Sequence, residues 1–597
     1  MSAGKTEWLR VIGMFSAVFA GGVVFLGLTS CVSAVSGERQ DAAAAGPPPV
    51  TSQAWSYPKN TRAARAGAGL TDFISGNFVG SARCGVCHDL LRDKAGNDMS
   101  ISNHWRSTMM ANAAKDPFWL AKVRSEVARN PAIKKVIEEK CATCHMPMAA
   151  TETKAGHGVV AMFDDGFLSA AAKLHASAMD GVSCSLCHQI QDEKLGTAAS
   201  FSGKYTVATA QPAPGRPIFG PYREPVARTM QGSVGYTPVY GSQTNDSALC
   251  ATCHTLFTPF VDAAGNVAGE FPEQTPYLEW RHSDFGVNAD RRYDIGENPG
   301  QGMNCQECHM PHSKEGGVNI ARYAPPELQP KDHFSQHHFV GGNVFMLNVL
   351  QDNSASLNLA ASFEKLEDTK QRTVRQLQND TADLAIESRR AGDELTVVVR
   401  VDNRVGHKFP TGFPSRNAWI HLAVQSPAGV VFESGRPLAD GRIAGNDADE
   451  KPGTFEPHYD AISKPDQVQI YETIMADTDG AVTYTLLRTA RYLKDNRLLP
   501  RGFDKKNAAP EIGVYGEAAQ DDNFGGGSDL VTYRIKTGDM HGPFIVRAAL
   551  LYSVISVNFM EDLRRDAGLA EVTSFVRQFD RADKQPVTVA VAQAEIR

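Results

Sequence analysis

A pentapeptide of the form Cys-x-x-Cys-His occurs five times in this chain of 597 residues. The copies are Cys84-Gly85-Val86-Cys87-His88, Cys141-Ala142-Thr143-Cys144-His145, Cys184-Ser185-Leu186-Cys187-His188, Cys250-Ala251-Thr252-Cys253-His254 and Cys305-Gln306-Glu307-Cys308-His309. Two thiols about one helical turn apart can each form a thioether bond with a haem vinyl group, and the adjacent imidazole then lies under the iron. Zinc sites or disulfides would not require a histidine after every cysteine pair. The pattern therefore predicts five c-type haems, with these histidines as proximal ligands.

Each iron also has a sixth coordination position, and the same part of the chain contains eight further histidines. The sequence favours four of them as distal ligands: His104, His175, His282 and His337. The remaining candidates here are His157, His312, His333 and His338, and one more, His407, lies further along the chain. An ordinary surface or core histidine is the alternative for each. Ligation by two histidines would favour electron transfer, because a saturated iron cannot bind substrate.

Residues 1–30 are predicted to be an export signal of the lipoprotein type, since basic residues precede a mostly apolar run. The run ends in Leu-Thr-Ser-Cys, which resembles a lipobox and predicts lipidation of Cys31, the one cysteine outside the haem motifs. An uncleaved membrane anchor is the alternative. Residues 31–70 are rich in Ala, Gly, Pro and Ser, as in a flexible tether. We expect a periplasmic or cell-surface protein held by lipid, with the outer membrane favoured.

The formal net charge of −7 argues against nucleic acid as a partner, because nucleic-acid binding rewards a basic surface. Redox proteins, other cytochromes or a membrane complex are the expected partners. The sequence does not indicate which of them donates electrons and which accepts them.

Residues 71–352 hold all five motifs, which leaves little chain per haem for a conventional core. We expect short helices and loops that wrap the porphyrins. The sequence predicts helices from Pro117, over 131–141, over 167–179 and over 277–282. The stretch 197–249 has many Gly, Pro, Thr and Ser residues and predicts a loop with a short hairpin.

Residues 353–378 are expected to form a connecting helix or lead-in, and the chain after them has a strand pattern. Alternating or β-branched runs occur at 394–401, 418–424, 468–474 and 544–550. Several strands within residues 379–597 favour a β-sandwich-like domain. The predicted fold is thus mixed: a mainly helix-and-loop multihaem domain followed by an all-β, sandwich-like domain.

Four segments resemble the multihaem cytochromes related to cytochrome c554, and the likeness covers most of residues 76–510. They are 102–109 (SNHWRSTM), 273–280 (EQTPYLEW), 337–343 (HHFVGGN) and 405–412 (VGHKFPTG). The resemblance implies electron transport through closely stacked haems. It also implies that the loop around His407 faces a haem, the alternative being a turn that locks the domain interface. Residues 495–500 (DNRLLP) are typical of the family, with no chemistry assigned to them.

The function that these features predict is electron transfer outside the cytoplasm through covalently bound haems. The alternative is an oxidoreductase with one five-coordinate haem that acts on a small nitrogen or sulfur compound, as in relatives of the family. The Cys-x-x-Cys-Lys motif of many multihaem nitrite reductases does not occur in the sequence. A third hypothesis is that the sandwich-like domain docks the cytochrome onto a partner complex or onto copies of itself.

Overall fold

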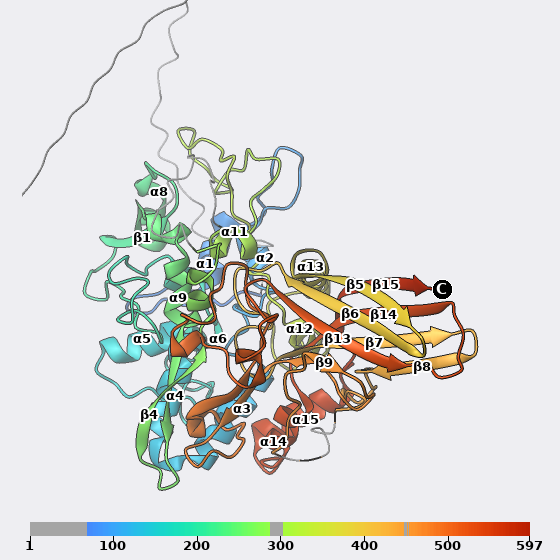
Figure 1. Cartoon of the computed structure of the whole chain (residues 1–597). Helices are drawn as coiled ribbons and strands as arrows, with labels where there is room; N and C mark the ends of the chain where they lie inside the picture. The colour runs from blue at the N-terminus through green and yellow to red at the C-terminus, as the bar shows by residue number, and fades with distance from the viewer. Residues whose placement is uncertain (1–68, 287–302, 447–450, 452) are drawn as a thin grey trace, which may run out of the picture. The chain divides into compact units, whose positions relative to one another are not determined.

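The computed structural model describes residues 69–286, 303–446, 451 and 453–597, all of which belong to one structural unit, Arg62–Arg597 (Figure 1). The predicted export signal, Cys31 and residues 31–68 of the predicted tether lie outside the described residues. Within the described ranges no helix is long and apolar enough to cross a membrane.

Short helices dominate the first part of the described chain. They are α1 Ser81–His88, α2 Ile101–Trp105, α3 Pro117–Arg129, α4 Lys134–His145, α5 Pro147–Ala155, α6 His175–Met179, α7 Cys184–Cys187, α8 Ala227–Val234, α9 Ser247–His254, α10 Pro276–Arg281, α11 Cys305–His309, α12 Val344–Asp352 and α13 Phe363–Asp380. Helix α3 begins at Pro117, as predicted, because the Asp116 carboxylate accepts hydrogen bonds from the first free backbone N–H groups, those of Phe118 and Trp119.

Two predictions for this part are wrong. Only the last turn of the expected helix over 167–179 is helical, because Phe167 N–H bonds back to the Ala161 carbonyl and the residues that follow form separate three-residue turns. In the stretch 197–249 the strands β1 Arg216–Gly220 and β2 Tyr236–Tyr240 pair in parallel, so they do not form a hairpin. Helix α8 makes the crossover that a parallel pair requires. A true hairpin follows, with strands β3 Leu256–Val261 and β4 Val267–Gln274.

The second part of the chain is rich in strands. They are β5 Ala382–Ala391, β6 Glu394–Asn403, β7 Asn417–Ser426, β8 Gly429–Ser434, β9 Ala461–Ile462, β10 Ile470–Tyr471, β11 Thr473–Ala476, β12 Arg491–Asp495, β13 Ser528–Lys536, β14 Phe544–Ser553 and β15 Val587–Ile596. One sheet has the order β5-β6-β13-β9, and the other has the order β10-β7-β14-β15 with β8 paired to β7. Alternate side chains of β6 and β13 share one apolar core with those of β7 and β14. A β-sandwich is the architecture that we infer from this shared core.

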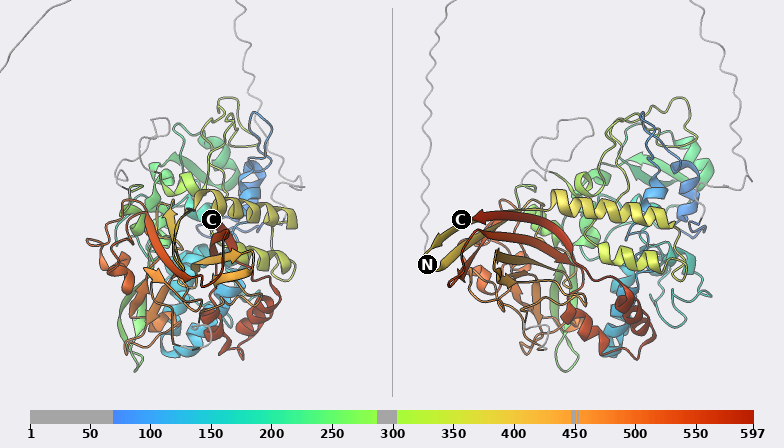
Figure 2. Two further views of the ribbon diagram at one scale, coloured as in Figure 1. Left: turned by 45° about the vertical axis from the view of Figure 1, so that its right-hand side comes forward. Right: turned by 90° about the vertical axis from the view of Figure 1, so that its right-hand side faces the viewer.

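The two parts are joined through helices. Helices α14 Val557–Arg564 and α15 Ala570–Arg581 lie between β14 and β15 in the chain and pack against α3. Helix α13 occupies most of the predicted connecting segment 353–378 and contacts α12, α2, β5 and β15 (Figure 2). The haem-motif part and the strand-rich part therefore share extensive contacts.

Candidate haem sites

Three Cys-x-x-Cys-His copies end helices α1, α4 and α9, the fifth forms all of α11, and the third forms α7 with His188 as its C-cap. The helix places both cysteines of a copy on one face, about one turn apart. Local capping explains two of the helix starts. Asp246 accepts a hydrogen bond from Ala248 N–H at 2.8 Å before α9, and Asn304 and Glu307 form a capping box at the start of α11. All ten motif cysteines are free thiols, as thioether formation requires.

Four of the five motif histidines are oriented by a hydrogen bond from Nδ1 to a backbone carbonyl. The pairs are His88 with Ile320 (2.7 Å), His145 with Ala113 (3.2 Å), His188 with Phe219 (2.6 Å) and His309 with Val340. Such a bond fixes the ring and directs Nε2 outward as the ligating nitrogen. For His254 the described residues offer no such carbonyl partner.

Burial keeps these imidazoles neutral. It lowers the pKa of His145 and His254 to about 4 and also lowers the pKa of the other three motif histidines. A neutral imidazole is the form that binds a metal. The orientation and the protonation state both fit a proximal ligand.

Two motif histidines each face a second histidine across a specific distance. The ring centres of His188 and His337 are 6.3 Å apart with 25° between their planes, and those of His309 and His407 are 6.4 Å apart with 15° between planes. Metal–nitrogen bonds of about 2 Å, plus about 1 Å from each nitrogen to its ring centre, place two trans imidazoles about 6 Å apart. One iron atom fits between the rings of either pair.

Two of the remaining histidines have buried ring nitrogens with no hydrogen-bond partner among the described residues. These nitrogens are Nδ1 of His104 and Nε2 of His338, and the two rings lie 4.6 Å apart. Burial lowers the pKa of His104 to about 4 and that of His338 to about 2, so both are neutral. A buried imidazole nitrogen needs a partner, and an iron would satisfy one. The sequence favours His337 over His338 as a distal ligand. The ring nitrogen of His338 that lacks a partner within the described ranges makes this residue as good a ligand candidate as His104.

The other predicted distal ligands have mixed surroundings. His175 directs Nδ1 to the Phe167 carbonyl at 2.9 Å, which leaves Nε2 available. His282 uses its Nε2 on the Asp504 carbonyl at 3.1 Å, so this nitrogen does not point toward a motif. His157 is exposed on a turn, and His312 and His333 are exposed with ring centres 6.0 Å apart. We retain His175 as a candidate on geometry, whereas the other four have no contact that favours ligation.

Thiols from different motifs lie within hydrogen-bonding reach of one another. Three such contacts exist, Cys84 with Cys184, Cys144 with Cys253 and Cys250 with Cys305. They bring together the first and third motifs, the second and fourth, and the fourth and fifth. These contacts therefore place the motifs side by side.

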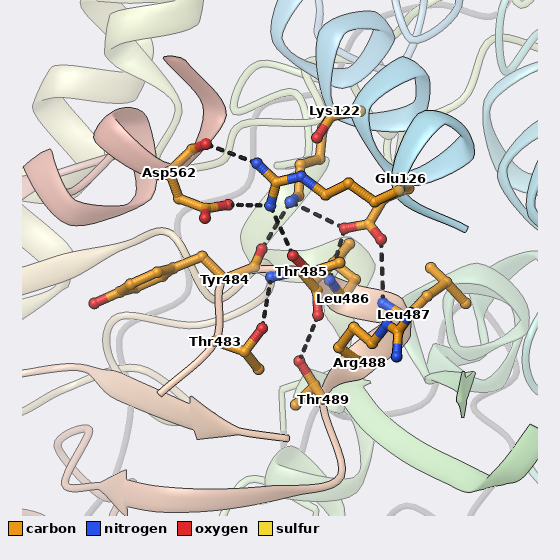
Figure 3. Close-up of polar contacts among 12 residues, drawn as sticks. Lys122, Glu126, Thr483, Tyr484, Thr485, Leu486, Leu487, Arg488, Thr489 and Asp562 are labelled. Carbon is orange, nitrogen blue, oxygen red and sulfur yellow. Dashed lines mark hydrogen bonds and ion pairs between the residues drawn. The ribbon is translucent and has the colours of Figure 1, made fainter. Parts of the chain in front are cut away.

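Two features beside the motifs were not predicted. The Trp119 ring stacks on His145 with 4.3 Å between ring centres and 4° between planes. Further along α3, the Glu126 carboxylate accepts the backbone N–H groups of Leu486 (2.6 Å) and Leu487 (3.2 Å), so the helix is tied to the strand-rich part (Figure 3). An aromatic residue three positions after a helix N-cap has no sequence signal that distinguishes ring stacking from ordinary packing.

A second cluster of metal-ligand residue types, His458 with Asp521 and Asp529, lies in the strand-rich part. Both amides beside it, Gln469 and Asn496, use their oxygens on backbone N–H groups and donate to His458 Nδ1 at 2.8 and 3.1 Å. The ring proton of neutral His458 must therefore sit on Nε2, which donates to Asp521 Oδ2 at 3.2 Å. A metal ion would need the Nε2 lone pair, so the cluster is a hydrogen-bonded network and does not fit a metal site.

Comparisons with known proteins found one similar solved structure, a penta-heme cytochrome c552 from Thermochromatium tepidum. The identity is 14% and the TM-score 0.43, and the match covers 83% of this chain and 96% of that one. No protein-family model and no curated protein matches the chain. The assignment of the haem sites therefore rests on the residues of this chain, and the resemblance to cytochrome c554 stays a prediction.

Proposed function

We propose that the chain is an exported multihaem cytochrome c that transfers electrons through five covalently bound haems. The observation that supports this most is the pair of imidazole couples, His188 with His337 and His309 with His407. Each couple consists of a motif histidine and a histidine outside the motifs, and the distance between their ring centres leaves room for one iron atom. When bound, haem supplies one-electron redox chemistry with a potential set by axial ligand, burial and nearby charge.

The side chains of this protein would hold the haems and set their surroundings. Ten thiols would anchor the rings, and the backbone carbonyls that bond to Nδ1 would orient the proximal imidazoles. His337 and His407 would close the sixth position on their haems, which excludes substrate from those irons. Close contact between thiols of different motifs favours transfer between neighbouring haems.

The test is to count and characterise the haems in the purified mature protein. We expect a mass increment of five haems, and a ferric electron paramagnetic resonance spectrum dominated by low-spin signals. His337→Ala and His407→Ala should each convert one low-spin signal to high-spin. A colourless protein, or one without the mass increment, would overturn the proposal. A high-spin signal in the wild type that nitrite or hydroxylamine perturbs would instead support the oxidoreductase alternative.

The proposed location is periplasmic or cell-surface, with a lipid on Cys31 as the anchor. Support comes from the lipobox-like sequence and from the need to attach c-type haems outside the cytoplasm. Membrane fractionation of wild type and Cys31→Ala tests this. We expect the wild type in the outer-membrane fraction and the variant in the soluble periplasmic fraction. If both stay with the inner membrane, an uncleaved apolar anchor is the better explanation. The proposed partners are other redox proteins, reached from this anchored position.

A further inference from the structure

The orientation of His407 depends on the residue that follows it. His407 lies in the loop between β6 and β7, and its Nδ1 contacts the carbonyl of Lys408 at 2.9 Å. With Nδ1–H donating to this carbonyl, Nε2 is the free nitrogen of the ring, whose centre lies 6.4 Å from that of His309. Any displacement of the Lys408 backbone would therefore turn the imidazole.

Lys408 is held at three points and is completely buried. Its backbone N–H donates to Glu279 Oε2 at 3.1 Å. Its ammonium group donates to Asp495 Oδ2 and to the Gly513 carbonyl, both at 2.7 Å. Both the backbone and the side chain of Lys408 are thus fixed.

Arg497 joins the two carboxylates that hold Lys408. Its Nε and Nη2 form a fork on Asp495 at 2.9 and 2.8 Å, and its Nη1 lies 3.0 Å from Glu279 Oε1. Both carboxylates and both cations are buried, and their charges cancel. Buried charges persist only when they are paired, so the four groups act as a unit.

Glu279 is the member of this unit that comes from the haem-motif part, on helix α10. Its Oε2 binds both the N–H of Lys408 and the Thr411 hydroxyl, the latter at 2.9 Å, and so holds the loop on both sides of Phe409-Pro410. The segments EQTPYLEW, VGHKFPTG and DNRLLP supply Glu279, Lys408 and the Asp495–Arg497 pair, respectively. Three segments that are far apart in the sequence thus meet next to His407.

We propose that Glu279, acting through Lys408, is a positioning residue that sets the orientation of His407 toward the iron bound by His309. This inference rests on the proposed function, since it requires a haem at the fifth motif. A metal-binding side chain must be held within about 0.5 Å of its productive position. Only one residue, Lys408, lies between Glu279 Oε2 and the imidazole of His407. Loss of Glu279 should therefore weaken or reorient the axial bond of one haem and leave the others unchanged.

Glu126 provides a matched control. It is also a buried glutamate of the haem-motif part that accepts backbone N–H groups from the strand-rich part, and it also pairs with a lysine, Lys122, at 2.9 Å (Figure 3). Unlike Lys408, its partners Leu486 and Leu487 are not next to a histidine in the chain. Replacing it should loosen the contact between the two parts without turning an axial ligand.

The experiment compares Glu279→Gln, Glu279→Ala, Glu126→Ala and His407→Ala in the full-length, haem-loaded protein. The readouts are the ferric paramagnetic resonance spectrum, the resonance Raman spin-state bands and a reductive titration. We expect His407→Ala to lose one of five low-spin signals. Glu279→Ala should shift or partly lose the same signal, with a smaller change for Glu279→Gln, which keeps an oxygen acceptor. Glu126→Ala should leave all signals in place.

The outcomes separate this inference from the proposed function. If both Glu279 variants match wild type while His407→Ala loses its signal, the positioning role is overturned and the electron carrier stands. If His407→Ala also matches wild type, His407 is not a ligand and the inference fails. If Glu126→Ala reproduces the change of Glu279→Ala, the effect is general loosening, which also overturns it. If the wild type has no haem, the proposed function itself fails.

Discussion

Asp495→Asn should be among the most destabilising single substitutions in the strand-rich part. Asp495 is 1% exposed and accepts hydrogen bonds from both Arg497 and Lys408. Burial by itself would raise its pKa, but the positive charges of Arg497 and Lys408 lower the pKa to about 2. It is therefore ionised at every pH at which the protein is handled, and the amide would leave two buried cations short of one negative charge.

Removal of one partner from a buried ion pair costs about 3–5 kcal/mol. With the strand-rich part, residues 379–597, as the unfolding unit, about 2–4 °C of melting temperature is lost per kcal/mol, so the expected fall is about 6–20 °C. Thermal unfolding of the haem-loaded protein, followed by far-ultraviolet circular dichroism, measures it. Asp402→Asn is the control, because the Arg400–Asp402 pair is partly exposed and such pairs contribute about 1 kcal/mol or less.

A double variant makes the test sharper. In Lys408→Met with Asp495→Asn, one positive and one negative charge are removed together, and Arg497 keeps Glu279 as its partner at 3.0 Å. The double variant should therefore be more stable than Asp495→Asn alone, which is a non-additive result. A melting temperature for Asp495→Asn within about 2 °C of the control, or strict additivity, would refute the argument that the four charges act as one unit.

Three further outcomes are expected. Trp119→Ala should shift only the low-spin signal of the haem on His145, because it removes the ring stacked on that imidazole. A ferric electron paramagnetic resonance spectrum identical to that of the wild type would contradict this. Gly406→Ala should cost about 1–3 kcal/mol in thermal unfolding, since the new Cβ would lie 3.0 Å from Trp280 Cδ1. Burial raises the pKa of Asp529 to about 7 in the folded protein, above its value near 4 in the unfolded chain. The proton that Asp529 holds therefore stabilises the fold below about pH 4, and this stabilisation is lost as the pH rises to about 7. In Asp529→Asn, the melting temperature should depend less on pH over that range.

The proximal haem ligands that we propose come from the sequence alone, because the chemistry of the motif is local. Cys-x-x-Cys-His needs only a helical turn to bring its three side chains together, and a five-residue window contains all of the information. The helix start at Pro117 is local in the same way, since Asp116 caps it. The expected helix over 167–179 failed because the N–H groups of Ser169, Ala172 and His175 each bond to the carbonyl three residues earlier, so the chain forms separate turns.

The distal ligands could not be ranked in this way. His337 and His338 are adjacent in the chain, yet the backbone directs one toward His188 and the other toward His104. His282 has a favourable helical context, but the Asp504 carbonyl from the strand-rich part occupies its Nε2. His407 is separated from His309 by an entire helix–strand region. A ligand completed by a distant segment depends on tertiary packing, which composition and spacing do not encode.

The order of the motifs in space differs from their order in the chain. The first motif lies beside the third, because helices α1 and α7 pack against each other. The fourth contacts the fifth, and the second also contacts the fourth, through Cys144 and Cys253. The fourth motif therefore has both the second and the fifth motif as neighbours, although neither the second nor the fourth is adjacent to the other in the chain.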